Sequence, residues 1–342
     1  MRIAFFDSKP YDKTWMEPLA EEYSHEIKFF DYKLNADTAV LAAGFETVCV
    51  FVNDTVDADV IDALHRGGVK LIALRCAGYN NVDFKAAYRI IHVVRVPSYS
   101  PAAVAEHAAA LMLSLNRRIH RAYVRTRDNN FSINGLMGVD LNGKTAGIVG
   151  TGKIGRIFID ICKGLGMKVI AYDPYPDNGT DIEYTDINSL FEKSDIISLH
   201  CPLTPETRHL INADSLSRMR PNVLIINTSR GGLIDTRALI DALRSRAVAG
   251  AGLDVYEEEE EYFFEDLSNE ILPDDELARL LSFPNVLITS HQGFFTSEAM
   301  QAIAEVTMGN IRTFERDEIL ANEICYMCGS TCRKTAGEKR CF

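Results

Sequence analysis

The chain has 342 residues, of which 47% are hydrophobic and 25% are charged, which is ordinary for a globular protein large enough for two domains. Its formal net charge of −12 argues against a general nucleic-acid-binding surface. The apolar runs are too short for a membrane span, and the N-terminal residues carry a charge too early for a signal peptide. We therefore expect a cytoplasmic protein without nucleic-acid or membrane partners.

Residues 1–98 alternate between short runs rich in branched and aromatic residues and amphipathic stretches. This alternation predicts a parallel sheet covered by helices, which would form one small domain. The expected strands are residues 2–6, 27–31, 47–52, 69–74 and 90–96, and the clearest helices are residues 15–23 and 58–65.

A long helix rich in small residues is predicted from Pro101 to about residue 123, with Ser100 as its N-cap. We interpret it as the crossing into a second domain, and its alanines favour close packing, for example against a second subunit. Six parallel strands are expected there, at residues 145–149, 169–172, 196–200, 223–227, 250–254 and 286–289. A helix over 297–314 should return to the first domain.

The predicted architecture is α/β, with two Rossmann-like or flavodoxin-like doubly wound domains and a cleft between them. Residues 1–99 and 295–342 would form a discontinuous substrate domain, and residues 100–294 the nucleotide-binding domain.

The stretch from Lys144 to Asp173 reads as strand, glycine turn, helix, strand and acid, which is the pattern of a dinucleotide-binding unit. Gly150 allows a tight turn, Gly152 lets a pyrophosphate approach the backbone, and Gly155 lets the helix pack on the strand. Asp173 can accept hydrogen bonds from ribose hydroxyls and would repel a 2′-phosphate, which favours NAD(H) over NADP. The alternative is a structural glycine turn that binds no nucleotide.

Polar side chains stand just after three strands of the second predicted sheet: Arg230, the glutamates Glu257 to Glu259, and His291. Ligands of doubly wound sheets bind beyond these carboxyl ends. A histidine can donate a proton to a reduced carbonyl, a carboxylate can hold the histidine ring, and an arginine can bind a carboxylate in bidentate fashion. Backbone amides at Ala77 and Gly78 could hold the other carboxylate oxygen. The set suits reduction of a 2-keto acid.

Each of these residues also has a structural interpretation. Arg230 could be a salt-bridge residue, and the glutamate run a solvated loop. Four other histidines are expected to be structural: His107 as a hinge or core group, His200 as a packed, hydrogen-bonded residue, and His120 and His209 on the surface.

The motifs NTSRGGLID, GLDVYE and SHQGFFT resemble the D-isomer-specific 2-hydroxyacid dehydrogenase family. RCAGYNNVD, VRVPSYSPAAVAEHA, GKTAGIVGTGKIG and SLHCPLTPET are similar to its bacterial fermentative D-lactate dehydrogenases. The resemblance implies NADH-dependent reduction of pyruvate to D-lactate and a homodimer or homotetramer. It also implies a catalytic Arg230, Glu259 and His291, with Glu259 chosen because the family places its glutamate five positions after Asp254.

Further contacts are implied by the same resemblance. Substrate contacts would be Tyr99, Phe51 and Phe295, the two phenylalanines lining a small pocket near the substrate methyl group. Cofactor contacts would be Lys153 and Ile154 at the pyrophosphate, Cys201 and Pro202 near the adenosine, and Thr228 and Asp254 near the nicotinamide.

Two other functions stay open. Another 2-hydroxyacid reductase would act on glyoxylate, hydroxypyruvate or a longer keto acid, and an NAD-sensing, corepressor-like binding protein would need no turnover.

Two groups of cysteines differ in setting. Cys49, Cys76, Cys162 and Cys201 lie in apolar runs, which favours small core residues in a reducing compartment. Cys325, Cys328, Cys332 and Cys341 lie in a tail whose spacing could hold a metal, but this signal is weak, so we expect a flexible tail with exposed thiols and no metal.

Overall fold

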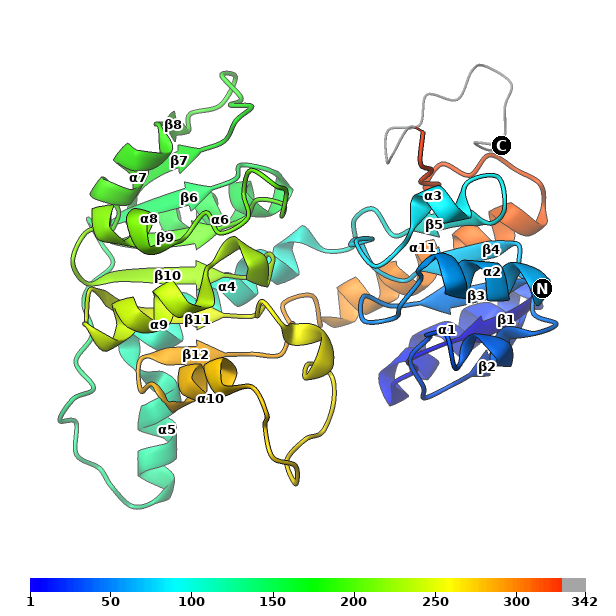
Figure 1. Ribbon diagram of the computed structural model, residues 1–342. Helices are drawn as coiled ribbons and strands as arrows, with labels where there is room; N and C mark the ends of the chain where they lie inside the picture. The colour runs from blue at the N-terminus through cyan, green and yellow to red at the C-terminus, as the bar shows by residue number, and fades with distance from the viewer. Residues whose placement is uncertain (328–342) are drawn as a thin grey trace. The chain divides into compact units, whose positions relative to one another are not determined.

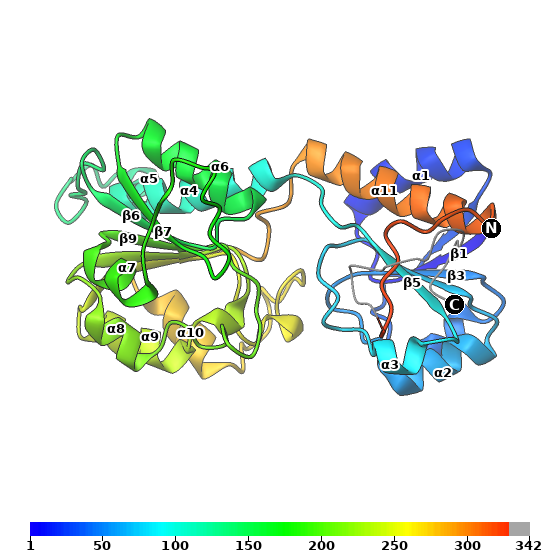
Figure 2. The ribbon, with the colours of Figure 1, turned by 90° about the horizontal axis from the view of Figure 1, so that it is seen from above.

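Two compact units make up the computed structural model, which describes residues 1–327 of the chain. The first unit combines Met1–Ser100 with the chain from Thr296 onward, and the second is Pro101–Phe295. In each unit, helices cover both faces of a parallel sheet (Figures 1 and 2). The predicted α/β class with two doubly wound sheets is confirmed. Within residues 1–327, no helix is long and apolar enough to cross a membrane.

The first unit holds a five-stranded sheet of order β2-β1-β3-β4-β5, with every pair of neighbours parallel. The strands are β1 (Arg2–Phe5), β2 (Glu26–Phe29), β3 (Thr47–Val50), β4 (Leu71–Leu74) and β5 (His92–Arg95). Figure 2 shows α1 (Pro10–Tyr23) and α11 (Ser297–Glu315) on one face, and α2 (Ala58–Arg66) and α3 (Phe84–Ala87) on the other. A short 3-10 helix, η1 (Ala39–Ala42), precedes β3.

Helix α11 brings the far end of the chain back to the first unit, as predicted. Its N-cap Thr296 accepts a hydrogen bond from the backbone of Ala299 (3.2 Å), and its buried stripe packs on α1, β4 and β5. The stripe is apolar at helical spacing, so burial of this one face stabilises the docked helix.

The second unit has a seven-stranded sheet of order β12-β11-β10-β9-β6-β7-β8. The strands are β6 (Thr145–Val149), β7 (Lys168–Tyr172), β8 (Glu183–Tyr184), β9 (Ile196–Leu199), β10 (Val223–Asn227), β11 (Val248–Leu253) and β12 (Val286–Ile288). Six strands were predicted; the seventh, β8, has only two residues, too few for a periodic pattern. Strand order reverses between β6 and β9, where such sheets bind their ligands.

Helices pack on both faces of this second sheet, and each face has its own hydrophobic core. One face carries α4 (Pro101–Arg117) and α6 (Lys153–Gly164) (Figure 2). The other carries α7 (Ile187–Lys193), α8 (Ala213–Arg218), α9 (Thr236–Arg244) and α10 (Asp275–Ser282). Two 3-10 helices, η2 (Gly231–Leu233) and η3 (Glu259–Glu261), follow β10 and β11.

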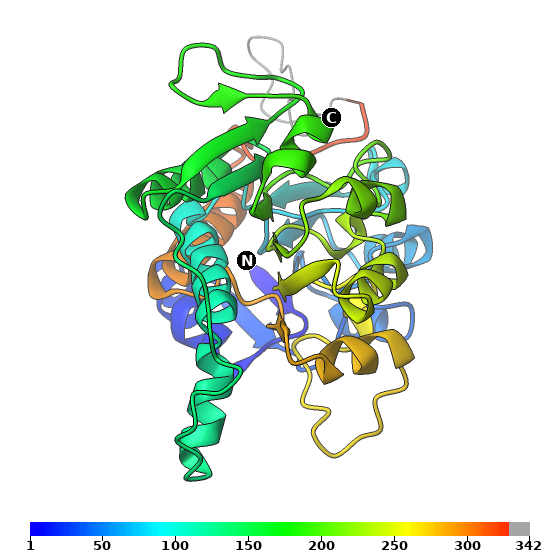
Figure 3. The ribbon, with the colours of Figure 1, turned by 90° about the vertical axis from the view of Figure 1, so that its left-hand side faces the viewer.

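The helix predicted over 101–123 is two helices, because the backbone of Arg118 is left-handed (φ +53°) and ends α4. The second, α5 (Ile119–Arg127), buries none of its residues and extends away from the sheet (Figure 3). Three alanines of α4, Ala105, Ala108 and Ala109, lie in the hydrophobic core of the unit. The helix also lies close to β11, because a Cβ on Gly252 would be 2.9 Å from Leu115 and 3.2 Å from Leu111. Small residues let this helix approach the sheet closely.

Two glycines give opposite predictions for stability. A Cβ on Gly309, inside α11, would meet nothing within 4 Å, whereas one on Gly147 of β6 would lie 2.1 Å from Oγ of Ser194. Gly309→Ala should stabilise the fold by about 0.5–1 kcal/mol, because it removes a helix-interior glycine. Gly147→Ala should destabilise it by about 1–3 kcal/mol through overpacking. Thermal unfolding followed by circular dichroism checks both, and midpoints that move in the same direction would contradict the geometry.

Candidate active site

Arg230 follows β10 in a turn held by the side chain of Asn227. The Asn227 amide donates to the Arg230 carbonyl (2.8 Å) and its Oδ1 accepts from the Ser229 backbone (3.0 Å). The Ser229 hydroxyl donates to the carbonyl of Leu199 on the neighbouring strand β9 (2.9 Å). The half-buried Arg230 therefore stands on a rigid turn at the carboxyl edge of the sheet, with its Nη1 donating to the Ser229 carbonyl (2.7 Å).

Gly231 brings this turn against the loop after β11. A Cβ at Gly231 would lie 2.0 Å from the backbone of Tyr256 and 2.4 Å from the amide of Glu257. No side chain fits there, so the loop with Arg230 and the loop with the glutamates are in direct backbone contact.

Glu259 is the glutamate that contacts His291. Its Oε1 lies 2.7 Å from Nδ1 of the histidine, and its Oε2 accepts a hydrogen bond from the Tyr256 backbone (2.8 Å). Both side chains are mostly buried, with 15% of Glu259 and 18% of His291 exposed. Because Nδ1 faces the carboxylate, Nε2 is the nitrogen that can donate to a substrate oxygen.

Glu257 is engaged elsewhere, although it lies two residues away. It contacts Nε2 of His209 (2.5 Å) and Nη2 of Arg208 (3.2 Å), and it accepts from the hydroxyl of Thr236 (3.2 Å). Glu258 is exposed. His209 lies at the surface, as expected: 35% of its side chain is exposed, and the ring pairs with Glu257.

A buried carboxylate, Asp254, holds the backbone of the loop that carries His291. It is 1% exposed and accepts hydrogen bonds from the Thr289 hydroxyl (2.6 Å) and from the amides of Gln292 (2.9 Å) and Gly293 (2.7 Å). Its own carbonyl accepts from the His291 amide (2.7 Å), which helps to keep that residue left-handed (φ +50°). Asp254 therefore positions the predicted proton donor, and its contact with the nicotinamide stays a prediction.

His200, predicted to be a packed residue, and His107, predicted to be a hinge or core group, are both held by side-chain contacts. Nε2 of His107 lies 3.0 Å from the Thr289 hydroxyl and 3.2 Å from Asp254. His200 contacts the hydroxyl of Ser198 (2.9 Å) and packs on Phe158 (ring centroids 5.0 Å apart), and burial lowers the pKa of its imidazole to about 3.

His120 lies at the surface on α5, a helix that buries none of its residues, as expected. Its side chain is half-buried, and this burial lowers the pKa of its imidazole.

The glycines after β6 form the turn that a pyrophosphate needs. Gly150 is left-handed (φ +95°), and a Cβ on Gly155 would lie 2.1 Å from the Gly150 carbonyl oxygen. A Cβ on Gly152 would meet no protein atom within 4 Å, so the space above this residue is open. No side chain caps the start of α6, where the half-buried Ile154 and the exposed Lys153 lie. A phosphate fits these free amides and the helix dipole.

Asp173 stands at the end of β7 and is ionised. Burial acts to raise the pKa of its carboxyl, but hydrogen bonds from the backbones of Thr151 (2.8 Å) and Tyr175 (2.9 Å) and from the Thr151 hydroxyl (3.0 Å) outweigh it and lower the pKa. A charged acid at this position can accept hydrogen bonds from ribose hydroxyls and would repel a 2′-phosphate.

The other predicted cofactor contacts also lie at this edge. Thr228 is buried, and within residues 1–327 its hydroxyl has no hydrogen-bond partner, so it could meet a ligand group. Its contact with the nicotinamide stays a prediction. Cys201 follows β9 and is half-buried, which raises the pKa of its thiol to about 11, and Pro202 beside it is exposed.

Comparison with known proteins agrees with this geometry. The model of the D-isomer specific 2-hydroxyacid dehydrogenase NAD binding domain matches residues 109–293. The chain is 50% identical to D-lactate dehydrogenase of Escherichia coli, over 95% of this chain and all of that protein. It is 52% identical to 2-hydroxyacid dehydrogenase homolog 1 of Schizosaccharomyces pombe, over 92% of this chain and 96% of the relative. The chain belongs to the D-isomer-specific 2-hydroxyacid dehydrogenase family.

A solved structure agrees over nearly the whole length. The pyruvate reductase of Chlamydomonas reinhardtii superposes with a TM-score of 0.89 at 44% identity, covering 94% of this chain and 98% of that one. The cofactor of the dehydrogenase is thus NAD, as Gly152 and Asp173 indicated.

The predicted substrate contacts belong to different units. In the first unit, Phe51 is buried after β3, Ala77 and Gly78 form a half-buried loop after β4, and Tyr99 is half-buried. In the second unit, Phe295 is 48% exposed and packs edge-on against Phe294. Their contacts with substrate stay predictions.

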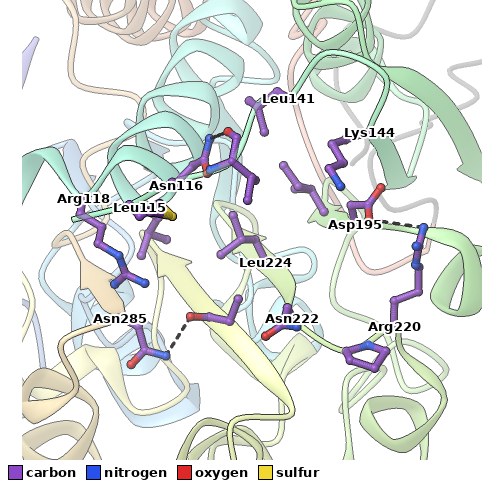
Figure 4. Close-up of a pocket in the computed structure, with 16 residues that line it drawn as sticks. Leu115, Asn116, Arg118, Leu141, Lys144, Asp195, Arg220, Asn222, Leu224 and Asn285 are labelled. Atoms are coloured by element: carbon purple, nitrogen blue, oxygen red, sulfur yellow. Dashed lines mark hydrogen bonds and ion pairs between the residues drawn. The ribbon is translucent and has the colours of Figure 1, made fainter. Parts of the chain in front are cut away.

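A cavity of about 450 Å³ lies at the opposite edge of the second sheet (Figure 4). Lys144, Asp195, Asn222 and Asn285, which line it, each stand just before a strand, whereas Arg230 and His291 follow strands. The cavity is therefore separate from the active site of the dehydrogenase.

Among the described residues, no group of three or more histidine, cysteine or acidic side chains could hold a metal. Cys328, Cys332 and Cys341 lie outside the described residues. Cys49, Cys162 and Cys201 are free thiols.

Gly152→Ala tests the nucleotide turn. A Cβ there is free of protein contacts but occupies the space above the backbone, so NADH should bind about tenfold or more weakly while the melting temperature stays unchanged. Fluorescence titration of NADH measures this, with Gly164→Ala as a control because its Cβ also meets nothing within 4 Å. Equal affinity in both variants would exclude a pyrophosphate at Gly152.

Proposed function

We propose that this dehydrogenase reduces pyruvate to D-lactate with NADH, reversibly. The observation that carries the proposal is the 2.7 Å contact between Nδ1 of His291 and Glu259, which stands beside the Arg230 turn at the ligand-binding edge of the nucleotide sheet. The D-lactate dehydrogenase named among its relatives, half identical over almost the whole chain, supports the substrate and the stereochemistry.

The proposed residues divide the work on the substrate. Bound NADH supplies the hydride. Nε2 of His291 donates a proton to the keto oxygen, and Glu259 stabilises the ring while it is charged. Arg230 binds the substrate carboxylate through its planar fork and polarises the adjacent ketone.

The remaining proposed contacts bind the small substrate. Amides of Ala77 and Gly78 hold the second carboxylate oxygen, Tyr99 contacts the substrate, and Phe51 and Phe295 enclose the methyl group. Thr228 and Asp254 lie near the nicotinamide, and Cys201 and Pro202 near the adenosine. Because one methylene changes binding by only about 1–3 kcal/mol, glyoxylate, hydroxypyruvate or a longer keto acid is the alternative substrate.

Two substitutions test the proton donor. His291→Ala should lower kcat for pyruvate by about 10²–10⁴-fold, as expected for loss of a general acid. Glu259→Gln should lower it by about 10–100-fold, because a charged hydrogen bond to the histidine is lost. NADH oxidation at saturating pyruvate measures both, and chiral chromatography of the product should show D-lactate.

The control is Glu258→Gln, which changes an exposed glutamate of the same run. This variant should keep wild-type kcat. Equal losses in the Glu258 and Glu259 variants, or an L-product, would refute the proposed roles. No turnover of any short 2-keto acid would instead favour an NAD-sensing binding protein.

The second proposed property is a homodimer, or a tetramer built from it, formed through an arm (residues 119–139) that comprises α5 and the segment after it. Seven of its large apolar side chains are 54–88% exposed, including Ile119, Tyr123, Phe131, Ile133 and Met137. Met137 and Val139 also line the cavity of Figure 4, so exposed apolar surface and cavity are continuous. A second copy would cover both, because apolar patches of this kind mark interaction sites.

The free thiols Cys49 and Cys162 support a cytoplasmic location.

Ile133→Asp tests the arm. A charge at this 81% exposed position should leave the fold intact and shift the protein toward monomer in sedimentation velocity. Ile271→Asp is the control, because Ile271 is 91% exposed but outside the arm. An unchanged sedimentation coefficient of the Ile133 variant, or equal shifts in both, would refute this interface.

A further inference from the structure

Two arginines of the first unit stand behind the loops to which the proposed function assigns substrate binding. Arg75 follows β4 and Arg95 ends β5, so both lie at the carboxyl edge of the five-stranded sheet, and Arg75 lies beside the end of β3. The proposed function gives neither arginine a catalytic role.

Arg75 is 3% exposed and lies between two aromatic rings. Its guanidinium carbon is 4.4 Å from the ring centroid of Phe5 and 4.8 Å from that of Phe51. Nη2 donates to the Asp7 carbonyl (2.7 Å), and Nε lies 3.6 Å from Asp12, so hydrogen bonding and charge fix the plane of the guanidinium. A fixed cationic plane against the Phe51 ring holds that ring in one orientation.

The backbone of Phe51 is fixed as well. Its amide donates to the buried carboxylate of Asp54 (2.6 Å), and its carbonyl accepts from the Asn81 side chain (2.9 Å). With backbone and ring both held, Phe51 cannot move aside to admit a longer substrate side chain.

Arg95 holds the other loop. Its Nη1 donates to the carbonyl of Ala77 (2.7 Å), and its guanidinium carbon lies 5.0 Å from the ring centroid of Tyr79. The Cys76 thiol donates to the Gly78 carbonyl (3.2 Å) within the same loop. Arg95 therefore fixes the peptide units that would present amides to the substrate carboxylate.

We infer that Arg75 and Arg95 are positioning residues with separate effects: Arg75 sets the preference for a short substrate side chain through Phe51, and Arg95 sets affinity for the 2-keto acid carboxylate through the Ala77–Gly78 loop. The inference rests on the proposed function. It divides substrate recognition in this unit between one rigid ring and one rigid loop.

The test compares Arg75→Met with Arg95→Met on pyruvate, 2-ketobutyrate and 2-ketoisocaproate. Arg75→Met should reduce the ratio of kcat/KM for pyruvate to that for the longer acids by about tenfold, the scale at which pockets discriminate single methylenes. Arg95→Met should raise KM for all three acids by a similar factor, with the ratio unchanged. NADH affinity should be unchanged in both variants.

The control is Arg2→Met. Arg2 also stacks on a phenylalanine (4.6 Å from the Phe45 centroid) and donates to a carbonyl (Gly44, 3.1 Å), but at the opposite edge of the same sheet. It should leave all three specificity constants unchanged. If Arg75→Met fails to fold, Arg75→Lys should shift the ratio in the same direction, because lysine lacks the planar stack.

Equal ratios in the Arg75 and Arg95 variants would overturn the inference while leaving the proposed function in place. A shifted ratio in the Arg2 control would overturn it too, by showing a general effect of loosening the unit. Absence of turnover by the wild-type chain with every 2-keto acid would refute the proposed function and the inference together.

Discussion

The chemistry proposed for this chain depends on one contact, between Nδ1 of His291 and Oε1 of Glu259. It joins residues 32 positions apart, so it exists only because parallel strands place the loops after β11 and β12 side by side. Each partner is fixed by its own backbone contact: Glu259 through the Tyr256 amide, and His291 through Asp254. Orientation of the imidazole is thus set by the sheet and not by the substrate.

Other loops that carry proposed ligand-binding residues are also held in place by contacts to their backbone. In both units, the groups assigned to ligands follow the carboxyl ends of strands, and in three of these loops a buried polar side chain holds the backbone. The side chains of Asn227, Asp254 and Asp54 form hydrogen bonds with the backbone of the Arg230 turn, the His291 loop and the Phe51 loop, respectively. Buried acceptors of this kind are costly unless fully used, so they fix loops that would otherwise adopt many conformations. The apolar layers beneath them supply the stability.

Much of the secondary structure and the glycine turn could be predicted from the sequence, because they depend on strong local sequence patterns. Strands β6 and β10 begin and end where predicted, and the glycine turn has the expected conformation at Gly150. The break at Arg118 could not be predicted, since no proline or glycine marks it and α5 loses its packing partners only in three dimensions. The choice of Glu259 needed a family resemblance, because the residues that engage Glu257, such as His209 and Thr236, come from distant parts of the chain.

Five consecutive glutamates, residues 257–261, would offer His291 several equivalent partners if the loop could slide. The structure removes that ambiguity at the first of them. Glu257 is anchored by Arg208, His209 and Thr236, and the adjoining peptide presses on Gly231. Because the contacts of Glu257 hold the start of the run in place, they also determine which of the following glutamates lies beside His291. A repetitive acidic segment thereby presents a single carboxylate, that of Glu259, to the imidazole of His291.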